Sequence, residues 1–386
     1  MLLAKDSVKS DARVISEAQG LIRNGYDVKV MVWGREGFSK KKEEYEQFVI
    51  ERIRLRTSFS NSSKLVFYLI LFNVIAFFRL LSENFDIIHC HDLDTLVAGL
   101  FAGKLKGKKV VYDSHEIYPL MVQKILPKIV VKILFILELL LIKRVDALIT
   151  VNEVFASYFE EGVGDKTTIS VVMNCKDPEN FMTSEKEVAE FKERFGMENH
   201  FIILYNGWLI PNNGLEELFN AIEMLRGQLE DLLVVICGDG SAKEEFKKLV
   251  KGKNIEKYVK FVGKIKWKNI PLFINACDVM YIVYNAADKY TFLRTPLRLF
   301  EAIAAAKPIL ASNFGELGRM IKKVKCGVFV DIGNPRELSS ILIEINRNKH
   351  LYEELCRNSK KASETYNWSV MEERLLNLYT KLCSAP

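Results

Sequence analysis

The sequence predicts an α/β protein built from two doubly wound halves of similar size. Short β-branched runs alternate with amphipathic segments of helix length along the whole chain, which is typical of parallel sheets covered by helices. The 386 residues exceed the length at which a single core usually stops growing, so two domains are expected. A polar, turn-forming segment at 173–187 lies between the halves and is the best linker candidate.

The expected strands follow in order along each half. In the first half they are 26–33, 48–55, 86–90, 109–113, 146–151 and 169–173. In the second half they are 201–206, 232–237, 259–263, 278–284, 308–312 and 327–331. Only "MLLA" precedes the first loop, which suggests a trimmed start or an abbreviated sheet edge. The segment 367–382 predicts a closing amphipathic helix capped by Asn367 or Ser369.

Composition narrows the functional classes. The formal net charge of +6 is modest for this length, and the charges are interspersed, which argues weakly for an anionic partner and weakly against a dedicated nucleic-acid binder. The seven cysteines include no CxxC pair and suit reduced core residues of a cytosolic protein. No signal peptide is evident at the N-terminus, so we expect a cytoplasmic protein.

Two apolar runs, 65–78 and 129–142, bear on the expected cytoplasmic location, because a long apolar helix could cross a membrane. Each is shorter than a membrane span and is interrupted by polar residues, so the sequence favours core helices. Lys124, Lys128 and Lys132 cluster at the start of the second run, where cations oppose the helix dipole unless an external anion such as a lipid phosphate compensates them. Peripheral membrane contact therefore stays open beside a solvated basic surface.

Candidate functional residues are expected where the strands end. Ligands of open α/β sheets bind beyond the carboxyl ends of the strands, and two such halves imply a cleft between them. Gly238 and Gly240 follow the strand at 232–237, and Gly207 follows the strand at 201–206. Glycine turns of this kind bring backbone amides close to a ligand, although they also occur for purely structural reasons.

The segment 291–312 begins an apolar helix. Thr295 is expected to cap this helix, with Pro296 as its first residue, where the missing N–H costs nothing. The free amides at the helix start would then face a bound anion, and they belong to Leu297, Arg298 and Leu299.

The same segment carries three charged side chains that packing does not require. Arg294 and Arg298 are unfavourable at the start of an isolated helix but complement a bound diphosphate. Glu301 must accept hydrogen bonds either from protein donors, including Arg298 three residues earlier, or from ligand hydroxyls. We favour ligand hydroxyls.

Histidines end two strands of the first half. His89, His91 and His115 lack metal-ligand spacing on one rigid element, so no metal site is expected. Asp92 and Asp94 are better explained as caps of the helix that follows them. A neutral His115 imidazole at a strand end can donate to a sugar hydroxyl or a phosphate oxygen.

Taken together, these residues resemble the retaining nucleotide-sugar glycosyltransferases of family 4, whose GT-B fold has two facing Rossmann-like domains. The segments that carry the resemblance run in order over nearly the whole chain: "SDARVISEAQGLIRNGYDVKVMVW", "HCHD", "VVYDSHE", "DALITVNEVFASYF", "VVMNCKDPENF", "ICGDGSAKEEF", "VKFVGKI", "RTPLRLFEAIAAAKPILAS" and "NWSVMEERLLNLY". Each motif alone is loose, but their order and spacing are specific. The resemblance implies an acceptor-side domain at 1–174, a nucleotide-sugar-binding domain at 175–365, and a helix at 366–386 that crosses back to the first domain.

The resemblance also implies a site. Glu301 would bind the ribose, the amides after Thr295 would hold the diphosphate, and His115 would reach the transferred sugar. The base would lie against the backbone of 263–265. The implied donor-binding residues are Gly207, Gly238, Gly240, Gly263, Lys264, Ile265, Arg294, Thr295, Pro296, Leu297, Arg298 and Glu301. The implied acceptor-side residues are Asp11, Arg13, His91 and Glu116, and the implied catalytic residues are His115 and Glu301.

The reaction implied by the resemblance moves a sugar from a UDP- or GDP-linked donor to a saccharide or lipid-linked acceptor. A front-face path would give retention, because the leaving diphosphate itself accepts the acceptor's proton. Neither a metal nor another cofactor is expected. Surface polysaccharide or glycolipid synthesis would be the setting, with possible peripheral contact to a membrane and no nucleic acid as partner.

The chain departs from the family pattern at the donor sugar. Leu293 stands where the family usually has the first of two glutamates, and Asp288 could replace it only if the loop is rearranged. This departure motivates an alternative function, a catalytically silent GT-B subunit that binds nucleotide or a partner glycosyltransferase. A sugar-nucleotide epimerase on the same fold is a more distant option.

The chain also departs from the pattern at the diphosphate. The family's Arg and Lys beside the glycine loop fall on or near Trp208 and Asn213, which removes two cations. Arg298, with Arg294 or Lys264, would have to supply the charge instead.

Overall fold

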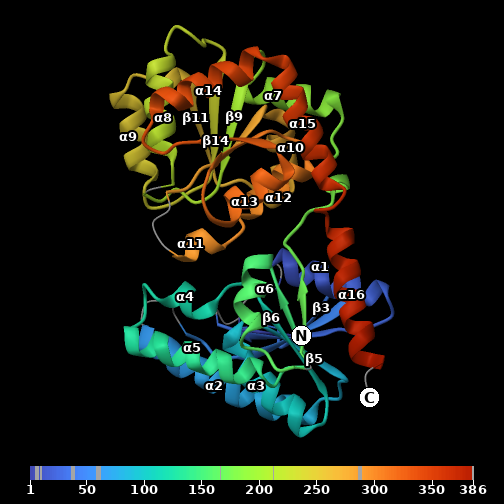
Figure 1. Cartoon of the computed structure of the whole chain (residues 1–386). Coiled ribbons are helices and arrows are strands. Elements are labelled where there is room, and N and C mark those ends of the chain that lie inside the picture. The colour runs from blue at the N-terminus through green and yellow to red at the C-terminus, as the bar shows by residue number, and fades with distance from the viewer. Residues whose placement is uncertain are drawn as a thin grey trace. The chain divides into compact units, whose positions relative to one another are not determined.

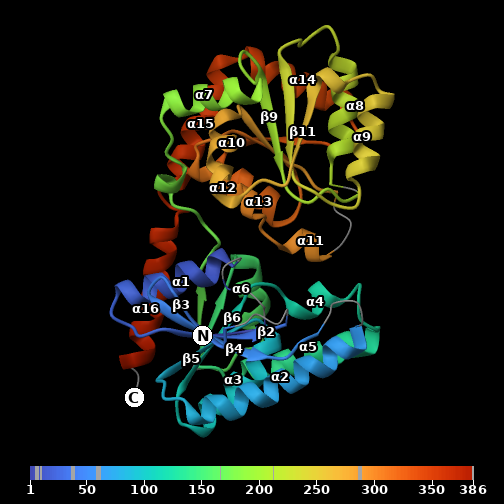
Figure 2. The same ribbon diagram turned by 180° about the vertical axis from the view of Figure 1, so that it is seen from behind.

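The computed structural model describes residues 1–4, 8, 11–35, 40–57, 62–165, 167–211, 213–285 and 289–384. It divides into two compact units, Met1–Asn174 with Met371–Pro386, and Cys175–Val370. Each unit contains a largely parallel sheet with helices on both of its faces (Figures 1 and 2). The predicted fold class, two doubly wound α/β halves, is therefore confirmed.

The sheet of the first unit has the strand order β3-β4-β2-β1-β5-β6-β7-β8. Its strands are β1 (Leu2–Leu3), β2 (Lys29–Gly34), β3 (Lys42–Tyr45), β4 (Phe48–Arg54), β5 (Ile87–His91), β6 (Lys109–Ser114), β7 (Ala147–Thr150) and β8 (Thr168–Val171). β3 pairs antiparallel with β4 at the sheet edge, and its charged sequence "KEEY" gave no strand signal. β1 lies between β2 and β5, so the expected abbreviated sheet edge is wrong, because this short strand is central and buried.

Helices cover both faces of this sheet. They are α1 (Ala12–Arg23), α2 (Ser62–Ser82), α3 (Leu93–Leu105), α4 (Tyr118–Val122), α5 (Lys128–Ile142), α6 (Glu153–Glu160) and the last part of α16 (Trp368–Ser384). α2, α3 and α5 lie together on one face, and α1 and α16 lie on the other (Figure 1). None of the helices described is long and apolar enough to cross a membrane.

The expectation that 65–78 and 129–142 form core helices is wrong in its main point. Both segments are helical, but α2 exposes Phe67, Ile70 and Phe78 at 60–64%, and α5 exposes Ile129 and Ile133 at 65% and 55%. A helix that is apolar all round is expected to be buried on all sides. Here one side of each helix packs against the rest of the unit, mainly against α3 and neighbouring elements, and the other side is exposed in the described residues.

The sheet of the second unit has the order β11-β10-β9-β12-β13-β14, and all its pairs are parallel. Its strands are β9 (Phe201–Asn206), β10 (Leu232–Cys237), β11 (Val259–Gly263), β12 (Val279–Ile282), β13 (Ile309–Ser312) and β14 (Gly327–Val330). Its helices are α7 (Glu185–Phe195), α8 (Leu215–Leu225), α9 (Lys243–Gly252), α10 (Ile270–Ala276), α11 (Lys289–Leu293), α12 (Leu297–Ala304), α13 (Gly315–Val324), α14 (Pro335–Arg347) and α15 (Lys349–Ser363).

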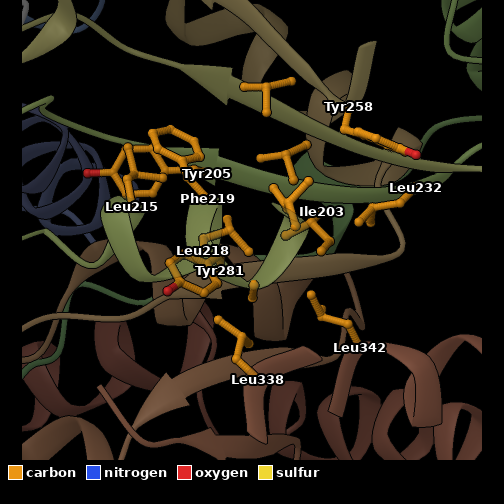
Figure 3. Packing of buried hydrophobic residues seen from close by; sticks show 14 of the residues in the cluster. Ile203, Tyr205, Leu215, Leu218, Phe219, Leu232, Tyr258, Tyr281, Leu338 and Leu342 are labelled. Carbon is orange, nitrogen blue, oxygen red and sulfur yellow. The ribbon is translucent and has the colours of Figure 1, made fainter. Parts of the chain in front are cut away.

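The core of the second unit fixes the strand ends that carry the site. Figure 3 shows Ile203 of β9 and Leu232 of β10 packed with Phe219 of α8 and Leu338 of α14. Tyr205, the residue before the last one of β9, belongs to the same buried cluster. Large buried side chains on both faces hold the strands rigidly, so the loops beyond their carboxyl ends start from fixed positions.

The closing helix α16 begins at a side-chain cap, as the sequence predicted. Asn367 Oδ1 accepts a hydrogen bond of 2.8 Å from the Val370 amide. Further along, the Tyr379 hydroxyl lies 2.8 Å from His89 Nδ1 of β5, and Arg374 Nη1 donates to the Val171 carbonyl at 3.1 Å. The helix is therefore tied into the first unit by buried polar contacts as well as by packing.

Candidate functional site

The second unit has three glycine turns at neighbouring strand ends. A side chain at Gly238 would place its Cβ 1.8 Å from the Gly207 carbonyl oxygen, and one at Gly240 would meet the Leu209 carbonyl oxygen at 2.2 Å. Backbone hydrogen bonds of 2.9 Å join Gly207 N to Cys237 O and Gly238 N to Gly263 O. Only glycine permits these close approaches, so the ends of β9, β10 and β11 form one compact backbone platform.

Arg298 projects from α12 to this edge of the sheet. The side chain is buried, with its Cζ 4.8 Å from the centre of the Tyr205 ring and 5.0 Å from the centre of the Tyr284 ring. Nη2 donates to the Tyr284 hydroxyl, whereas Nη1 has no hydrogen-bond partner among the described residues. Gly207 leaves space beside the guanidinium, because a Cβ there would lie 3.4 Å from Cζ and Nη1.

Glu301 lies one turn further along α12 and is 8% exposed. Within the described residues its carboxylate accepts one long hydrogen bond, 3.5 Å from Asn206 Nδ2 to Oε2. No ion pair with Arg298 is formed in this part of the chain. Burial raises the pKa of Glu301, against the lowering effects of Lys176 and Arg298. The carboxylate therefore keeps most of its accepting capacity for a ligand.

The start of α12 differs from the prediction. The helix runs from Leu297, Pro296 is the N-cap rather than the first helical residue, and no side-chain cap bond is formed. The expected Thr295 cap is therefore wrong. The Leu299 amide donates to the Pro296 carbonyl at 3.0 Å, so of the three amides expected to be free this one is engaged. The amides of Leu297 and Arg298 precede the first helical bond and remain the candidate anion donors.

Arg294, Lys264 and Ile265, which were also predicted to bind the sugar donor, are less buried than Arg298 and Glu301. Arg294 is half-buried, with its Cζ 5.6 Å from the centre of the Tyr284 ring and 5.4 Å from that of the Tyr290 ring. Beyond β11, Lys264 is exposed and Ile265 is half-buried. Asp288, named as a possible replacement for the missing glutamate, lies outside the described residues.

Trp208 and Asn213, which stand where the resemblance would place two cations, lie in the loop after β9. Asn213 is 3% exposed, and its Nδ2 donates to the Tyr205 hydroxyl at 2.9 Å and to the Trp208 carbonyl at 3.2 Å. The Tyr205 hydroxyl itself donates to the Trp208 carbonyl at 2.7 Å. Asn213 is thus committed to holding the loop, while the Trp208 side chain is 75% exposed. Arg298 is left as the buried cation of this edge.

Sequence reasoning missed the groups that position Arg298. Tyr205 and Tyr284 sandwich the guanidinium, and Ser312 at the end of β13 holds Tyr284 through two backbone bonds, 2.7 Å from its amide and 2.9 Å to its carbonyl. Aromatic residues at strand ends are usually explained by packing. Their position at the carboxyl ends of β9 and β12 was the available signal.

The first unit gathers buried charges around Asp113 at the end of β6. Arg13 Nη2 donates to Asp113 Oδ1 at 2.8 Å and Nε donates to Oδ2 at 3.0 Å. Arg13 Nη1 donates to the Val172 carbonyl at 2.6 Å and to Asn174 Oδ1 at 3.0 Å. Burial alone would raise the pKa of Asp113, but Arg13 and His115 hold it well below its usual range. Arg13 is therefore fully engaged inside the unit.

His115 completes this cluster. Its Nε2 lies 3.0 Å from Asp113 Oδ2, and its Nδ1 lies 3.7 Å from Asp92 Oδ2. Burial would lower its pKa, but Asp92 and Asp113 together raise it to about 9. The expected neutral imidazole is therefore wrong, because two carboxylates from separate strand ends favour the cation. Nδ1 is beyond hydrogen-bond distance of Asp92, so among the described residues its N–H is left for a ligand.

The aspartates after β5 do not cap α3 with their side chains. Asp92 occupies the N-cap position with φ 61°, but its Oδ1 accepts from the His115 amide at 3.1 Å, so the expected side-chain cap is wrong. Asp94 lies in the first turn. Of the acceptor-side residues, Asp11 caps α1 by accepting from the Val14 amide at 3.4 Å, and Glu116 accepts from Ser114 Oγ through its carbonyl at 2.8 Å.

The same cluster contains a set of groups that could hold a metal ion. One ligand atom each from Glu17, His89, His91 and Asp113 lies within 4.8 Å of the others, and all four residues are buried. Arg13 argues against a metal here, because its guanidinium occupies both oxygens of Asp113 and lies 2.9 Å from Glu17 Oε1. Burial raises the pKa of Glu17 to about 8 and lowers that of His91. The set is better described as a cluster of buried titratable groups around a fixed cation, in which His89 Nε2 and His91 Nε2 have no hydrogen-bond partner among the described residues.

Two family models match the chain, one on each side of the unit boundary. Residues 12–180 match the model described as Glycosyltransferase Family 4, and residues 187–362 match the model described as Glycosyl transferases group 1. Together they cover every strand of both sheets except β1.

Known proteins resemble the chain at low identity. Alpha-monoglucosyldiacylglycerol synthase of Acholeplasma laidlawii is 24% identical over 220 residues, which are 57% of this chain and 53% of that protein. Alpha-D-kanosaminyltransferase of Streptomyces kanamyceticus is 22% identical over 200 residues, 52% of this chain and 50% of that protein. The chain thus spans about half the length of these relatives. The crystal structure of Anabaena Alr3699/HepE in complex with UDP superimposes with a TM-score of 0.73 at 15% identity and covers 98% of both chains.

Proposed function

Because the chain belongs to glycosyltransferase family 4, we propose that it transfers a sugar from a nucleoside diphosphate sugar to an acceptor hydroxyl with retention of configuration. The observation that carries the proposal is Arg298 Nη1, a buried donor at the strand ends of the second unit that has no hydrogen-bond partner in the part of the chain that the structure describes. A buried, partly unpaired guanidinium is costly, and a diphosphate is the anion that matches its planar donors.

Donor binding would use both charged residues of α12. Arg298 and the amides of Leu297 and Arg298 would hold the diphosphate, and the Glu301 carboxylate would accept hydrogen bonds from the ribose hydroxyls. The base would lie over the backbone from Gly263 to Ile265, where φ of Gly263 is 83° and no atom lies within 4 Å of its absent Cβ. UDP- and GDP-linked sugars are both candidates.

The chemistry assigned to this site needs little beyond positioning and charge. The bond between the sugar's anomeric carbon and the diphosphate oxygen breaks, and the acceptor oxygen bonds to that carbon on the same face. The acceptor's proton passes to the leaving phosphate oxygen, and Arg298 stabilises the negative charge that develops there. His115 would donate its Nδ1–H to the transferred sugar. No cofactor enters this scheme, so activity should survive treatment with a chelator.

The acceptor is a saccharide or a lipid-linked molecule presented at a membrane, within surface polysaccharide or glycolipid synthesis. One relative is named for the synthesis of a glycolipid, which supports the lipid-linked acceptor. The exposed apolar helices of the first unit support contact with a membrane.

Replacement of Glu301 by Ala tests the donor site. Loss of charge-assisted hydrogen bonds to a ribose should weaken UDP or GDP binding by roughly 1.5 to 3 kcal/mol. Titration calorimetry with nucleoside diphosphates measures this, and Glu353→Ala on the outer helix α15 is the control. Unchanged affinity would remove Glu301 from the site.

Turnover over a panel of UDP- and GDP-sugars tests the reaction, with the anomeric configuration of the product read by NMR. Donor binding without turnover on any donor, and activity that appears only beside a second glycosyltransferase chain, would favour the silent subunit instead. Inversion at the anomeric carbon would contradict the same-face path.

A further inference from the structure

The outer face of the first unit carries two rows of exposed apolar side chains. On α2 they are Phe67, Ile70, Val74 and Phe78, exposed at 63%, 60%, 46% and 64%. On α5 they are Ile129, Ile133, Ile136 and Leu140, exposed at 65%, 55%, 51% and 50%. Each row repeats every three to four residues, so each forms one stripe along its helix. Scattered exposed apolar residues are ordinary, but two long stripes on one face are not.

Between the stripes lies an apolar groove. Its volume is about 570 Å³, and α2, α3 and α5 contribute nearly all of its lining, including Phe77, Phe101, Val130 and Leu134. Figures 1 and 2 show the three helices together on this face of the unit. Asn73 also lines the groove, but its amide is used internally, donating to the Leu69 carbonyl at 3.0 Å and to the Asp94 carbonyl at 2.8 Å. Asp94 and Tyr118 are the other polar residues of the lining, and the rest are apolar, so the groove presents mainly hydrocarbon.

The exposed charged residues on α5 and next to its ends are all basic. Lys124 and Lys128 are exposed before and at the start of α5, Lys132 is exposed one turn later, and Lys143 and Arg144 are exposed just beyond its end. The acid of this helix, Glu138, is 1% exposed and accepts a hydrogen bond of 2.8 Å from the Tyr112 hydroxyl. α5 thus shows solvent an apolar stripe and basic residues. Lys128 and Lys132 lie at the helix end where the dipole disfavours cations, so an external anion would relieve them.

We propose that the face formed by α2, α3 and α5 docks on an anionic lipid bilayer. The stripes of α2 and α5 enter the boundary between headgroups and acyl chains, a lipid chain fills the groove, and the lysines of α5 contact lipid phosphates. A second copy of this chain fits less well, because it would oppose lysines to lysines across a self-complementary contact. The inference rests on the proposed function in that it names where a lipid-linked acceptor is held.

Vesicle flotation of the full chain tests the inference without donor or turnover. Phosphatidylcholine vesicles with and without phosphatidylglycerol are compared, and binding is expected to the anionic vesicles and to fall with added salt. Each Lys near an anionic surface contributes about a fivefold factor in partitioning, so Lys124→Gln, Lys128→Gln and Lys132→Gln together should lower it by about a hundredfold. The matched control is Lys186→Gln, Lys349→Gln and Lys360→Gln in the second unit.

A second variant tests the apolar stripe. Ile129→Gln, Ile133→Gln and Ile136→Gln together should lower partitioning by more than about a hundredfold, because three side chains no longer leave water. Their exposure makes misfolding no concern for the variant, and Ile210→Gln, Met182→Gln and Met224→Gln form the control in the second unit.

The outcomes separate this inference from the proposed function. No binding of the unchanged chain to anionic vesicles, or binding unaffected by both variants, would overturn it. A dimer in light scattering that the Ile variants disrupt, with no vesicle binding, would assign the face to a second copy instead. Vesicle binding without turnover on any donor would count only against the proposed function, and turnover with a soluble acceptor but no vesicle binding would count only against this inference.

Discussion

The two units partner one central buried charge each in different ways. In the first unit Asp113 is saturated, since Arg13 and His115 both contact its oxygens at 2.8 to 3.0 Å. In the second unit, among the described residues, one donor of the Arg298 guanidinium has no partner, and the Glu301 carboxylate accepts one bond of 3.5 Å. A carboxylate with both oxygens engaged holds its partners in place, whereas groups with few bonds on a rigid platform keep binding capacity for a ligand. In the first unit the protein itself fixes the protonation of His115. In the second unit Arg298 can still bind an anion.

Replacing the central carboxylate of each unit by an amide should show the largest difference. Asp113→Asn removes the one carboxylate that Arg13 and His115 share, although Glu17 and Asp92 remain beside them, so the free energy of unfolding of the first unit should fall by about 3 to 5 kcal/mol. Glu301→Gln makes the same chemical change at an unpaired, buried carboxyl whose pKa burial has raised, so stability there should stay the same or rise. Urea unfolding followed through Trp33, buried in the first unit, measures the first effect. An equal loss of free energy of unfolding in both variants would show that the two carboxylates do not differ in this way.

The sequence predicted the second unit better than the first, for physical reasons. The strands of the second unit are apolar runs ended by polar residues or glycine, so their limits agree with the prediction to within about two residues. The segments of α2 and α5 were predicted to be core helices. A sequence that is apolar all round does not show which side of a helix the rest of the protein covers. β3 was missed because its charged residues gain strand structure only by pairing with β4.

The candidate site was predictable in its residues but not in its protonation and contacts. Glu301 and Arg298 stood out because charges at the start of an apolar helix require a reason. The rings that hold Arg298 come from β9 and the end of β12, which are far apart in the sequence. The charge of His115 likewise depends on Asp92, which follows another strand. Such couplings arise only when parallel strands bring their carboxyl ends to one edge.

Replacement of Arg298, whose Nη1 has no partner among the described residues, should give the next largest effect. Arg298→Gln should weaken UDP or GDP binding by about 10- to 100-fold, which corresponds to the loss of one charge-assisted bond of about 1.5 to 3 kcal/mol. Binding of uridine or guanosine should change much less, because neither carries a phosphate. Titration calorimetry compares the ligands, with Arg319→Gln, whose partner Glu316 is in its own helix, as the control. An equal loss for nucleoside and diphosphate would show that Arg298 acts on the fold of the site rather than on the anion.

The buried cluster around Asp113 should also make the stability of the first unit fall toward alkaline pH. Asp92 and Asp113 raise the pKa of His115, against burial, from 6.5 to about 9, so the folded unit keeps a proton that the unfolded chain releases between these values. This contribution is fully present below pH 6.5 and is lost as the pH rises through 9. Glu17 acts in the same direction, because burial raises its pKa from 4.5 to about 8.

One proton bound more tightly by the folded unit corresponds to a loss of about 1 kcal/mol per pH unit across the window above pH 6.5. Urea unfolding through Trp33 at stepped pH values measures this slope, and His115→Gln should make it shallower while leaving the second unit unchanged. A slope that is the same with and without His115 would assign the alkaline loss to Glu17 alone. Stability that rises in this window would mean that the histidine is neutral in the folded protein, and the contrast between a preset cation and a receptive site would then fail.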